Sequence, residues 1–421
     1  MEEAQKLIQS EPAPGVSYFT PVQNPPSGTA ADPQSDGSRP PKLFRPLKVR
    51  GVTFQNRIGL APLCQYSSDD GHMTDWHMSH LGGIAMRGPG FVMTEATSVL
   101  AEGRISPEDA GLWKDSQIEP LRRVVEFVHS QNQKIGIQLA HAGRKASALA
   151  PFLADTEVAP EHANGWPDNV KGPSDIPFSD TLAQPKAMTK RDIADVKEAW
   201  GAAVRRAVKA GVDYIELHCA HGYLLFSFCS PVSNNRTDEY GDSFENRIRL
   251  TSEIITISRQ NMPKDMPLFL RISASEWLEE TRPDLPSWKS EDTVRFAQIL
   301  AEKGEVDLLD VSAGGNHPDQ KIIPGPCFQA HFAHAVKEAV GDRLLVGAVG
   351  SINNGVDADG LLEKGLDLVL VGRLFLKNPS VVWQFAEDLG TELKFANQIG
   401  WAFGRRGPQG FIKTKKREEK I

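Results

Sequence analysis

Two histidines and a tyrosine stand close together at the end of one apolar segment. In the stretch YIELHCAHGY, His218 and His221 are three residues apart, and Tyr223 follows two residues later. The pair can bind a metal, or it can donate hydrogen bonds to one substrate oxygen, as an oxyanion hole does. It can also be structural, an interpretation that suits His221 better than His218. No third metal ligand is evident, so we expect no metal site.

Glycines and an arginine at the ends of two other apolar segments predict an anion site. Gly350 ends the run LLVGAVG, and Gly372 and Arg373 end the run LDLVLVGR. Glycines let backbone N–H groups approach a phosphate, and an arginine can pair with it through two hydrogen bonds. We therefore expect a phosphorylated cofactor or substrate here. Ordinary turn glycines are the alternative.

Two polar side chains lie within further apolar segments. Gln138 is in KIGIQLA and Arg271 is in PLFLRIS. The amide of Gln138 has a donor and an acceptor that match the edge of a uracil-like ring, and Arg271 can stabilise anionic charge beside it. Together with a phosphate site, this pattern favours FMN. A buried salt bridge of Arg271 is the alternative.

These residues need elements that bring them together. Apolar runs rich in Val, Ile and Leu predict strands that are buried on both faces. The predicted strands are 58–62, 91–97, 134–140, 214–219, 267–273, 306–314, 344–350 and 366–373. The predicted helices are 116–131, 189–211, 243–260, 290–303, 327–340 and 354–364. This alternation predicts an α/β fold, a (β/α)8 TIM barrel whose strand ends carry the site. A doubly wound sheet is the alternative, but no GxGxxG follows the first strand.

Composition excludes several classes of function. The chain has 421 residues, a formal net charge of -7 and 40% hydrophobic residues, so nothing favours nucleic acid or an anionic membrane as a partner. No apolar run approaches the ~20 residues that span a bilayer. The start lacks the pattern of a secretory signal, and the four cysteines form no CxxC. We expect a cytoplasmic protein without a disulfide framework.

The composition along the chain predicts one domain between two terminal segments. Residues 1–41 are rich in Pro, Ser, Gly and Asp, which predicts a flexible, extended N-terminal arm. Residues 42–403 are globular in composition, and we expect them to form a single FMN-binding barrel domain. Residues 404–421 form a short basic tail, which we expect to be solvated and disordered.

Several long stretches resemble the Old Yellow Enzyme family of FMN-dependent ene-reductases. The resemblance is greatest to the thermophilic-like and xenobiotic-reductase-like subgroup. It is carried by APLCQYSSDDGHMTDWHMSHL (61–81), KIGIQLAHAGRKA (134–146), YIELHCAHGYLLFSFCSPVSNNRTDEYGDSFENRIR (214–249), FLRISASEW (269–277), VGAVG (346–350) and VGRLFLKNP (371–379). It extends from about residue 42 to 403.

The resemblance implies which residues hold the cofactor. The thiol of Cys64 would lie near the reactive end of the flavin and tune its potential, whereas yeast-type relatives carry threonine there. Other residues would contact the ring or the phosphate. The full set is Pro62, Cys64, Ala96, Gln138, Arg271, Gly350, Gly372 and Arg373.

The resemblance also implies a reaction. NADPH or NADH would reduce FMN, and flavin N5 would deliver hydride to the β-carbon of an alkene activated by a carbonyl or nitro group. His218 and His221 would bind the activating oxygen, Tyr66 would help to hold the substrate, and Tyr223, or a water, would protonate the α-carbon. A biosynthetic flavin oxidoreductase or dehydrogenase that uses the same site is the alternative, and a non-catalytic flavin-binding protein is a second one.

Two features depart from the family pattern. In several relatives a C-terminal arginine enters the neighbouring subunit's pocket, and here Trp401 stands at that place, with Arg405 or Arg406 as substitutes. We therefore expect Trp401 to contact substrate in a homodimer or a dimer of dimers. A long insert at 147–188 follows the third predicted strand, so we expect it to shape access to the site.

Overall fold

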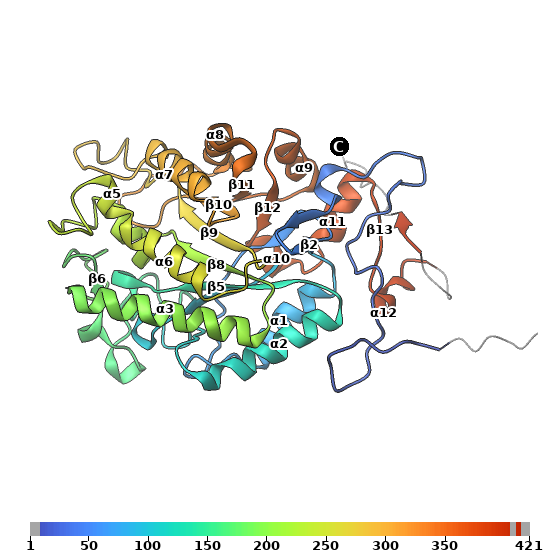
Figure 1. The fold of residues 1–421 in the computed structure, drawn as a ribbon, viewed down its shortest axis with the longest axis horizontal. Helices are drawn as coiled ribbons and strands as arrows, with labels where there is room; N and C mark the ends of the chain where they lie inside the picture. Colours follow the sequence, from blue (N-terminus) through green and yellow to red (C-terminus); the bar gives the residue numbers. More distant parts are fainter. Residues whose placement is uncertain (1–8, 405–409, 414–421) are drawn as a thin grey trace, which may run out of the picture.

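A closed barrel of parallel strands forms the centre of the protein (Figure 1). The computed structural model describes residues 9–404 and 410–413. The barrel strands are β3 (Ile58–Leu60), β4 (Val92–Ser98), β5 (Ile135–Ala140), β8 (Tyr214–Cys219), β9 (Leu268–Ser273), β10 (Leu308–Ser312), β11 (Leu345–Val349) and β12 (Leu368–Val371). They pair in the order β3-β12-β11-β10-β9-β8-β5-β4, and a parallel bridge between Gly59 and Phe91 closes the ring. The predicted (β/α)8 TIM barrel is confirmed.

Helices cover the outside of this barrel. They are α1 (Asp75–Ala85), α2 (Ile118–Ser130), α3 (Lys190–Ala210), α4 (Leu224–Cys229), α5 (Phe244–Arg247), α6 (Arg249–Gln260), α7 (Ser290–Lys303), α8 (Ala330–Val340), α9 (Gly355–Glu363), α10 (Arg373–Lys377), α11 (Val381–Leu389) and α12 (Asn397–Gly400). Gly211, at φ +94°, ends α3 where the sequence predicts a stop. The predicted helix 243–260 is divided into α5 and α6, and α1 was not predicted because its two glycines and two histidines interrupt the apolar stripe.

Short elements complete the chain. The 3-10 turns are η1 (Lys42–Phe44), η2 (Ala101–Gly103), η3 (Asp115–Gln117), η4 (Gly143–Lys145), η5 (Glu161–Ala163), η6 (Pro167–Asn169) and η7 (Gly341–Arg343). The short strands are β1 (Leu47–Val49), β2 (Val52–Phe54), β6 (Lys171–Gly172), β7 (Lys186–Ala187), β13 (Glu392–Leu393) and β14 (Ile412–Lys413). The insert 147–188 therefore contains η5, η6 and the β6–β7 pair.

Alternate residues of the barrel strands lie in two different environments. Tyr214 and Phe269 pack inside the barrel with Phe91, whereas Ile215 belongs to the layer between strands and helices. Phe54, from the β1–β2 hairpin, closes the N-terminal end and stacks on Phe91 with ring centroids 3.8 Å apart. Aromatic side chains therefore fill the N-terminal half of the interior, and polar side chains find room only toward the C-terminal ends.

The described part of the N-terminal arm packs against the barrel (Figure 1). The side chain of Gln133 donates to the carbonyl of Ser27 at 3.0 Å, and that of Asn56 donates to the carbonyl of Gly28 at 3.0 Å. Gln133 and Asn56 precede β5 and β3, so the arm lies at the N-terminal end of the barrel. The expectation of a flexible arm is thus wrong for this part, because amide hydrogen bonds compensate the ordering entropy that its few apolar side chains cannot.

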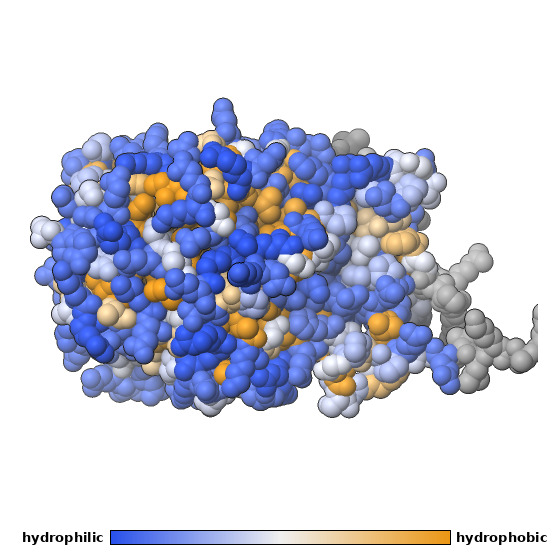
Figure 2. All heavy atoms as spheres, in the orientation of Figure 1, coloured by the Kyte–Doolittle hydropathy of each residue, from blue (hydrophilic) through white to orange (hydrophobic). Residues whose placement is uncertain are grey.

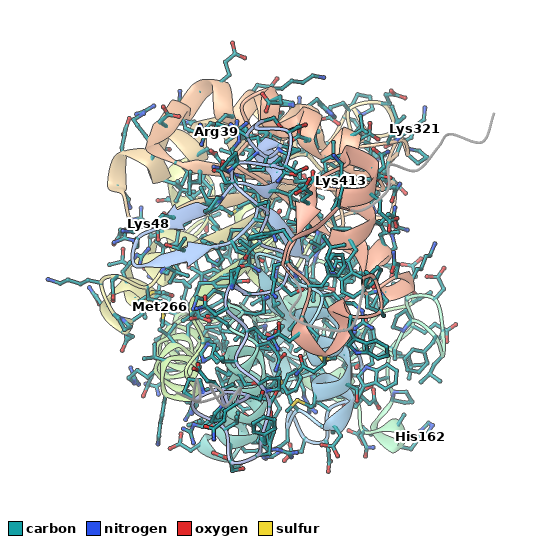
Figure 3. The ribbon with its side chains drawn as sticks, turned by 90° about the vertical axis from the view of Figure 1, so that its right-hand side faces the viewer. Arg39, Lys48, His162, Met266, Lys321 and Lys413 are labelled. Atoms are coloured by element: carbon teal, nitrogen blue, oxygen red, sulfur yellow. The ribbon has the colours of Figure 1, made fainter. Side chains whose placement is uncertain are left out.

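The two ends of the described chain meet at the same place. The Gln23 side chain donates to that of Gln398 at 2.8 Å, and β13 pairs antiparallel with β14. Figure 3 labels Lys413 of β14 at this end of the molecule. The expected disordered tail is therefore a strand at 412–413, while 405–409, which includes Arg405 and Arg406, and 414–421 lie outside the described residues.

The face of the protein in Figure 2 is largely hydrophilic, with apolar side chains in small patches. No helix of the described chain is long and apolar enough to cross a membrane.

Two glycine substitutions test the packing of the barrel. A Cβ at Gly136 would come within 2.2 Å of the Tyr214 ring, which is anchored through its hydroxyl to the carbonyl of Val92 at 2.6 Å. We expect Gly136→Ala to lower the free energy of unfolding by about 1–3 kcal/mol in urea titrations. Gly83→Ala, in the open interior of α1, should raise it by up to ~1 kcal/mol. Equal effects of the two substitutions would contradict this account.

Candidate active site

A cavity of about 550 Å³ opens at the C-terminal ends of the barrel strands. Its size is within the range of ordinary cofactor sites. Several residues that the sequence predicts for the site line it, namely Pro62, His221, Arg271, Gly350, Gly372 and Arg373. Arg271, Arg373 and Lys377 give the wall positive charge, and the described lining residues include no Asp or Glu. The cavity is therefore suited to an anionic ligand such as a phosphate.

The loop after β11 brings backbone close to this cavity. Gly350 has φ +113°, which a residue with a side chain rarely adopts, and a Cβ there would lie 2.5 Å from Nε2 of Gln329. That amide in turn donates to the carbonyl of Val349 at 3.0 Å. The position thus requires glycine, and with Gly372 and Arg373 the donor set fits the phosphate of FMN.

A layer of buried polar side chains lies inside the barrel just below the site. Gln138 donates to Oε1 of Glu216 at 2.7 Å, and Nε of Arg271 lies 2.9 Å from Oδ2 of Asp310 as an ion pair. Burial and then Asp310 raise the pKa of Glu216 to about 8, and burial raises that of Asp310 to about 6 against the effect of Arg271. Arg271 therefore forms the buried salt bridge that was the alternative to a role in the site, and it also lines the cavity.

Ala96 lies in the same layer of the barrel. It is the Cα partner of Gln138, and its side chain is buried. Oε2 of Glu216 and both carboxylate oxygens of Asp310 accept no hydrogen bond from the described residues. Buried polar atoms that lack hydrogen bonds are costly, so their presence beside the cavity fits a polar ligand edge at this place.

His218, His221 and Tyr223 come together above this layer. The ring centroid of His218 lies 5.2 Å from that of His221 and 5.0 Å from that of Tyr223. Burial and then Arg271 hold the pKa of both histidines well below the usual value, so both rings are neutral at pH 7. Nδ1 of His218 has no hydrogen-bond partner among the described residues, while Nε2 of His221 lies 2.8 Å from Oγ of Ser312.

The tyrosines and the cysteine of the site are held protonated. Burial and then the nearby Cys64 raise the pKa of Tyr223 well above its usual value, and the same two causes raise that of Tyr66. Burial and then Asp109 raise the pKa of the Cys64 thiol. Tyr66 has φ +49°, a strained backbone geometry that directs its ring toward Phe152 of the insert, with centroids 6.0 Å apart.

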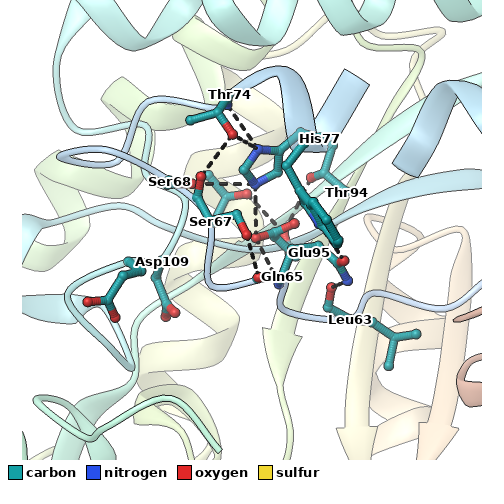
Figure 4. Close-up of polar contacts among 12 residues, drawn as sticks. Leu63, Gln65, Ser67, Ser68, Thr74, His77, Thr94, Glu95 and Asp109 are labelled. Carbon is teal, nitrogen blue, oxygen red and sulfur yellow. Dashed lines mark hydrogen bonds and ion pairs between the residues drawn. The ribbon is translucent and has the colours of Figure 1, made fainter. Parts of the chain in front are cut away.

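A buried histidine–glutamate pair holds the segment that carries Cys64 and Tyr66 (Figure 4). Oε1 of Glu95 accepts the backbone N–H of Gln65 at 3.1 Å and lies 3.3 Å from Nε2 of His77. The backbone N–H of Thr74 donates to Nδ1 of His77 at 3.0 Å, so that nitrogen is an acceptor and the ring proton is on Nε2, facing Glu95. This contact fixes the orientation of the segment.

Trp401 lies away from this site within its own chain. It follows α12, where the Asn397 side chain donates to the carbonyl of Val22 in the arm, so it is at the N-terminal end of the barrel. Its side chain is 57% exposed. The structure therefore brings the other predicted site residues together at one end of the barrel, and places Trp401 at the other.

The sequence prediction did not include several polar residues that belong to the site. The sequence pattern could have identified Glu216 and Asp310 as site residues, since each is a charged residue within a buried apolar strand. It could not have identified Ser312 and Lys145, because their significance depends on contacts with distant parts of the chain. Among the described residues, no group of three or more His, Cys, Asp or Glu could hold a metal ion.

Comparisons with known proteins place the chain in a family. The model of the NADH:flavin oxidoreductase / NADH oxidase family matches residues 42–392. An NADH:flavin oxidoreductase of Gibberella zeae is 52% identical over 418 residues, which cover 98% of this chain and 100% of that protein. An NADPH dehydrogenase of Geobacillus sp. is 41% identical over 366 residues, covering 86% of this chain and 99% of that protein.

Solved structures agree on the fold. Morphinone reductase superposes with a TM-score of 0.67 at 23% identity, over 82% of this chain and 89% of that chain. A 2-naphthoyl-CoA reductase superposes with a TM-score of 0.72 at 22% identity, over 83% of this chain and 53% of that chain. The chain therefore belongs to the NADH:flavin oxidoreductase / NADH oxidase family, and is an FMN-dependent NAD(P)H oxidoreductase of the Old Yellow Enzyme type.

Proposed function

We propose that the protein reduces the C=C bond of alkenes activated by a carbonyl or nitro group, with NADPH or NADH as electron donor. One observation carries this proposal. Two neutral imidazoles, His218 and His221, and a protonated phenol, Tyr223, meet beside a cationic cavity at the C-terminal end of the barrel. These groups can bind an oxygen and supply a proton.

The two histidines bind the activating oxygen of the substrate. A neutral imidazole still donates one N–H, so the pair can supply two donors to one oxygen that gains negative charge during the reaction. FMN, when bound, supplies the hydride that reduces the β-carbon. Because burial and then Arg271 lower the pKa of both histidines, the rings act as neutral hydrogen-bond donors and add no further positive charge to this buried place.

Tyr223 supplies the proton to the α-carbon. Because burial raises its pKa, its hydroxyl remains protonated across the neutral pH range. Tyr66 and Cys64 border the same place, and Tyr66 orients the substrate. For the cofactor, Gly350, Gly372 and Arg373 hold the phosphate, while the remaining predicted residues contact the ring system; they are Pro62, Cys64, Ala96, Gln138 and Arg271.

Trp401 contributes to the site only in an assembly. We propose a homodimer in which Trp401 approaches the site of the neighbouring subunit. Its exposure, together with that of Phe403 and Phe411, supports an interface at this end of the barrel. Sedimentation of the wild type measures whether the dimer exists, and that of Trp401→Ser measures whether Trp401 contributes to it. A monomeric wild-type protein would exclude the proposal.

A substrate panel tests the proposed activity. The flavin-loaded protein is mixed anaerobically with NADPH or NADH and then with 2-cyclohexenone, a nitroalkene, or saturated cyclohexanone as the control. Bleaching of the flavin by the nicotinamide followed by reoxidation with the two alkenes is the expected result. Bleaching without reoxidation by any alkene would refute alkene reduction. In a separate anaerobic mixture of the oxidised flavin-loaded protein without nicotinamide, bleaching of the flavin by cyclohexanone would favour a dehydrogenase.

Arg373 provides a test of the cofactor site. An arginine–phosphate contact is charge-assisted, so we expect Arg373→Met to weaken FMN binding by about 1.5–3 kcal/mol, which is roughly 10-fold to 150-fold in Kd. Quenching of FMN fluorescence measures this. Arg343→Met, an arginine of η7 that bonds only backbone carbonyls in the described chain, is the matched control. Equal values of Kd for both variants would remove Arg373 from the site.

Two substitutions separate the two roles at the substrate. We expect His218→Ala to slow alkene reduction by roughly 100-fold, the cost of one lost donor of ~3 kcal/mol. We expect Tyr223→Phe to slow it by about 100-fold or more while NADPH still reduces the flavin at the wild-type rate. Tyr240→Phe, which removes a hydroxyl bonded to Lys197 and Glu253, is the control. Unchanged alkene turnover in Tyr223→Phe would assign the proton to another group.

A further inference from the structure

Lys145 connects three parts of the active site. It ends η4, directly after β5, and its side chain is half-buried. Its Nζ donates to the carbonyl oxygen of His221 at 3.0 Å and to that of Gly315 at 2.9 Å. No other donor among the described residues bonds to either oxygen. One ammonium group therefore bridges the loop after β8 and the loop after β10.

These two loops have left-handed backbone positions and touch each other. His221 has φ +59°, in the left-handed region that is unfavourable for a non-glycine residue. Gly315 has φ +91°, and a Cβ on it would lie 2.5 Å from Cα of His221. A Cβ on Gly222 would lie 2.4 Å from the carbonyl oxygen of Gly315. The direction of the His221 ring thus depends on how this backbone contact is held.

Aromatic rings surround the same ammonium group. Nζ lies 5.2 Å from the ring centroid of Tyr223 and 4.4 Å from that of Phe178, which belongs to the insert. Both distances are within the range of cation–π attraction. The charge of Lys145 therefore also holds the Tyr223 ring, and it connects the insert to the loop that carries the catalytic groups.

We propose that Lys145 is a positioning residue whose ammonium group clamps the carbonyls of His221 and Gly315, and so sets the directions in which His221 and Tyr223 face the substrate. This inference rests on the proposed reduction of activated alkenes. Lys145 transfers no proton and bonds no substrate atom in this role.

The charge of the clamp depends on pH. Burial and then Arg144, the neighbour on the same turn, lower the pKa of Lys145 to about 7. The other groups that face it from β8 and the loop after it are His218 and His221, both neutral, and Tyr223, which is protonated. Lys145 alone among them changes charge near neutrality, so the clamp is cationic below about pH 7 and weakens above it.

The test compares two half-reactions of the flavin-loaded enzyme by stopped flow. We expect Lys145→Met to slow reoxidation of the flavin by 2-cyclohexenone about tenfold or more, and to slow reduction by NADPH less than about threefold, because that step needs no proton from Tyr223. In the wild type, reoxidation should slow as the pH rises through about 7, and Lys145→Met should lack this dependence. Equal slowing of both half-reactions would overturn the proposal.

Two further variants keep the test decisive. Lys145→Arg keeps the positive charge over the pH interval in which the lysine loses it. Its reoxidation rate should therefore stay level between about pH 6 and 9, and a remaining decline near pH 7 would overturn the proposal. Lys197→Met removes a similar half-buried lysine of α3, which lies 5.8 Å from the Tyr240 ring and pairs with Glu253 of α6, and should change neither half-reaction.

Amide hydrogen exchange provides a readout that is independent of activity. In the flavin-loaded protein, Lys145→Met should speed exchange in peptides that cover 220–224 and 313–317, and Lys197→Met should not. Unchanged exchange in these peptides would show that the clamp does not exist. If wild-type enzyme is reduced by NADPH but never reoxidised by any alkene, the proposed function fails instead, and the exchange result still decides on the clamp.

Discussion

The narrow interior of the closed barrel is the constraint on which the rest of the structure depends. Strand residues alternate inward and outward, so each inward position on a strand is two residues from the next. Phe91, Tyr214 and Phe269 fill the N-terminal layer, and the hairpin closes it with Phe54. Two residues after Tyr214 comes Glu216, and two after that comes His218. Apolar packing at one end thus determines where the chemistry can be placed.

One guanidinium sets much of the electrostatics above that packing. Arg271 pairs with Asp310 and opposes the rise in pKa that burial causes in this carboxyl and in Glu216. The same charge, after burial, lowers the pKa of both site histidines. A single buried cation therefore helps two carboxyl groups to ionise and keeps two imidazoles neutral. Such a layer is costly to bury, and the polar cavity directly above it reduces that cost.

The sequence predicted the barrel because buried parallel strands are almost continuously apolar, a pattern that most of the barrel strands show, although β4 is more polar. It predicted most of the site because strand ends follow directly from strand positions. Lys145 escaped prediction since its carbonyl partners are 76 and 170 residues away. The arm was misjudged for a related reason. Its polar composition predicts disorder, whereas its hydrogen bonds to Asn56, Gln133 and Gln398 exist only once the barrel has formed.

The packing of the arm has a consequence for how the chain is made. Gln23 and Gln398 are 375 residues apart in sequence. At roughly 5–20 residues per second, a ribosome needs tens of seconds after releasing the arm to deliver its partner. During that interval the arm cannot close its contacts with the last helices, although the first barrel strands have already emerged. Docking of the arm is therefore a late step, and it marks the completion of synthesis of the whole domain.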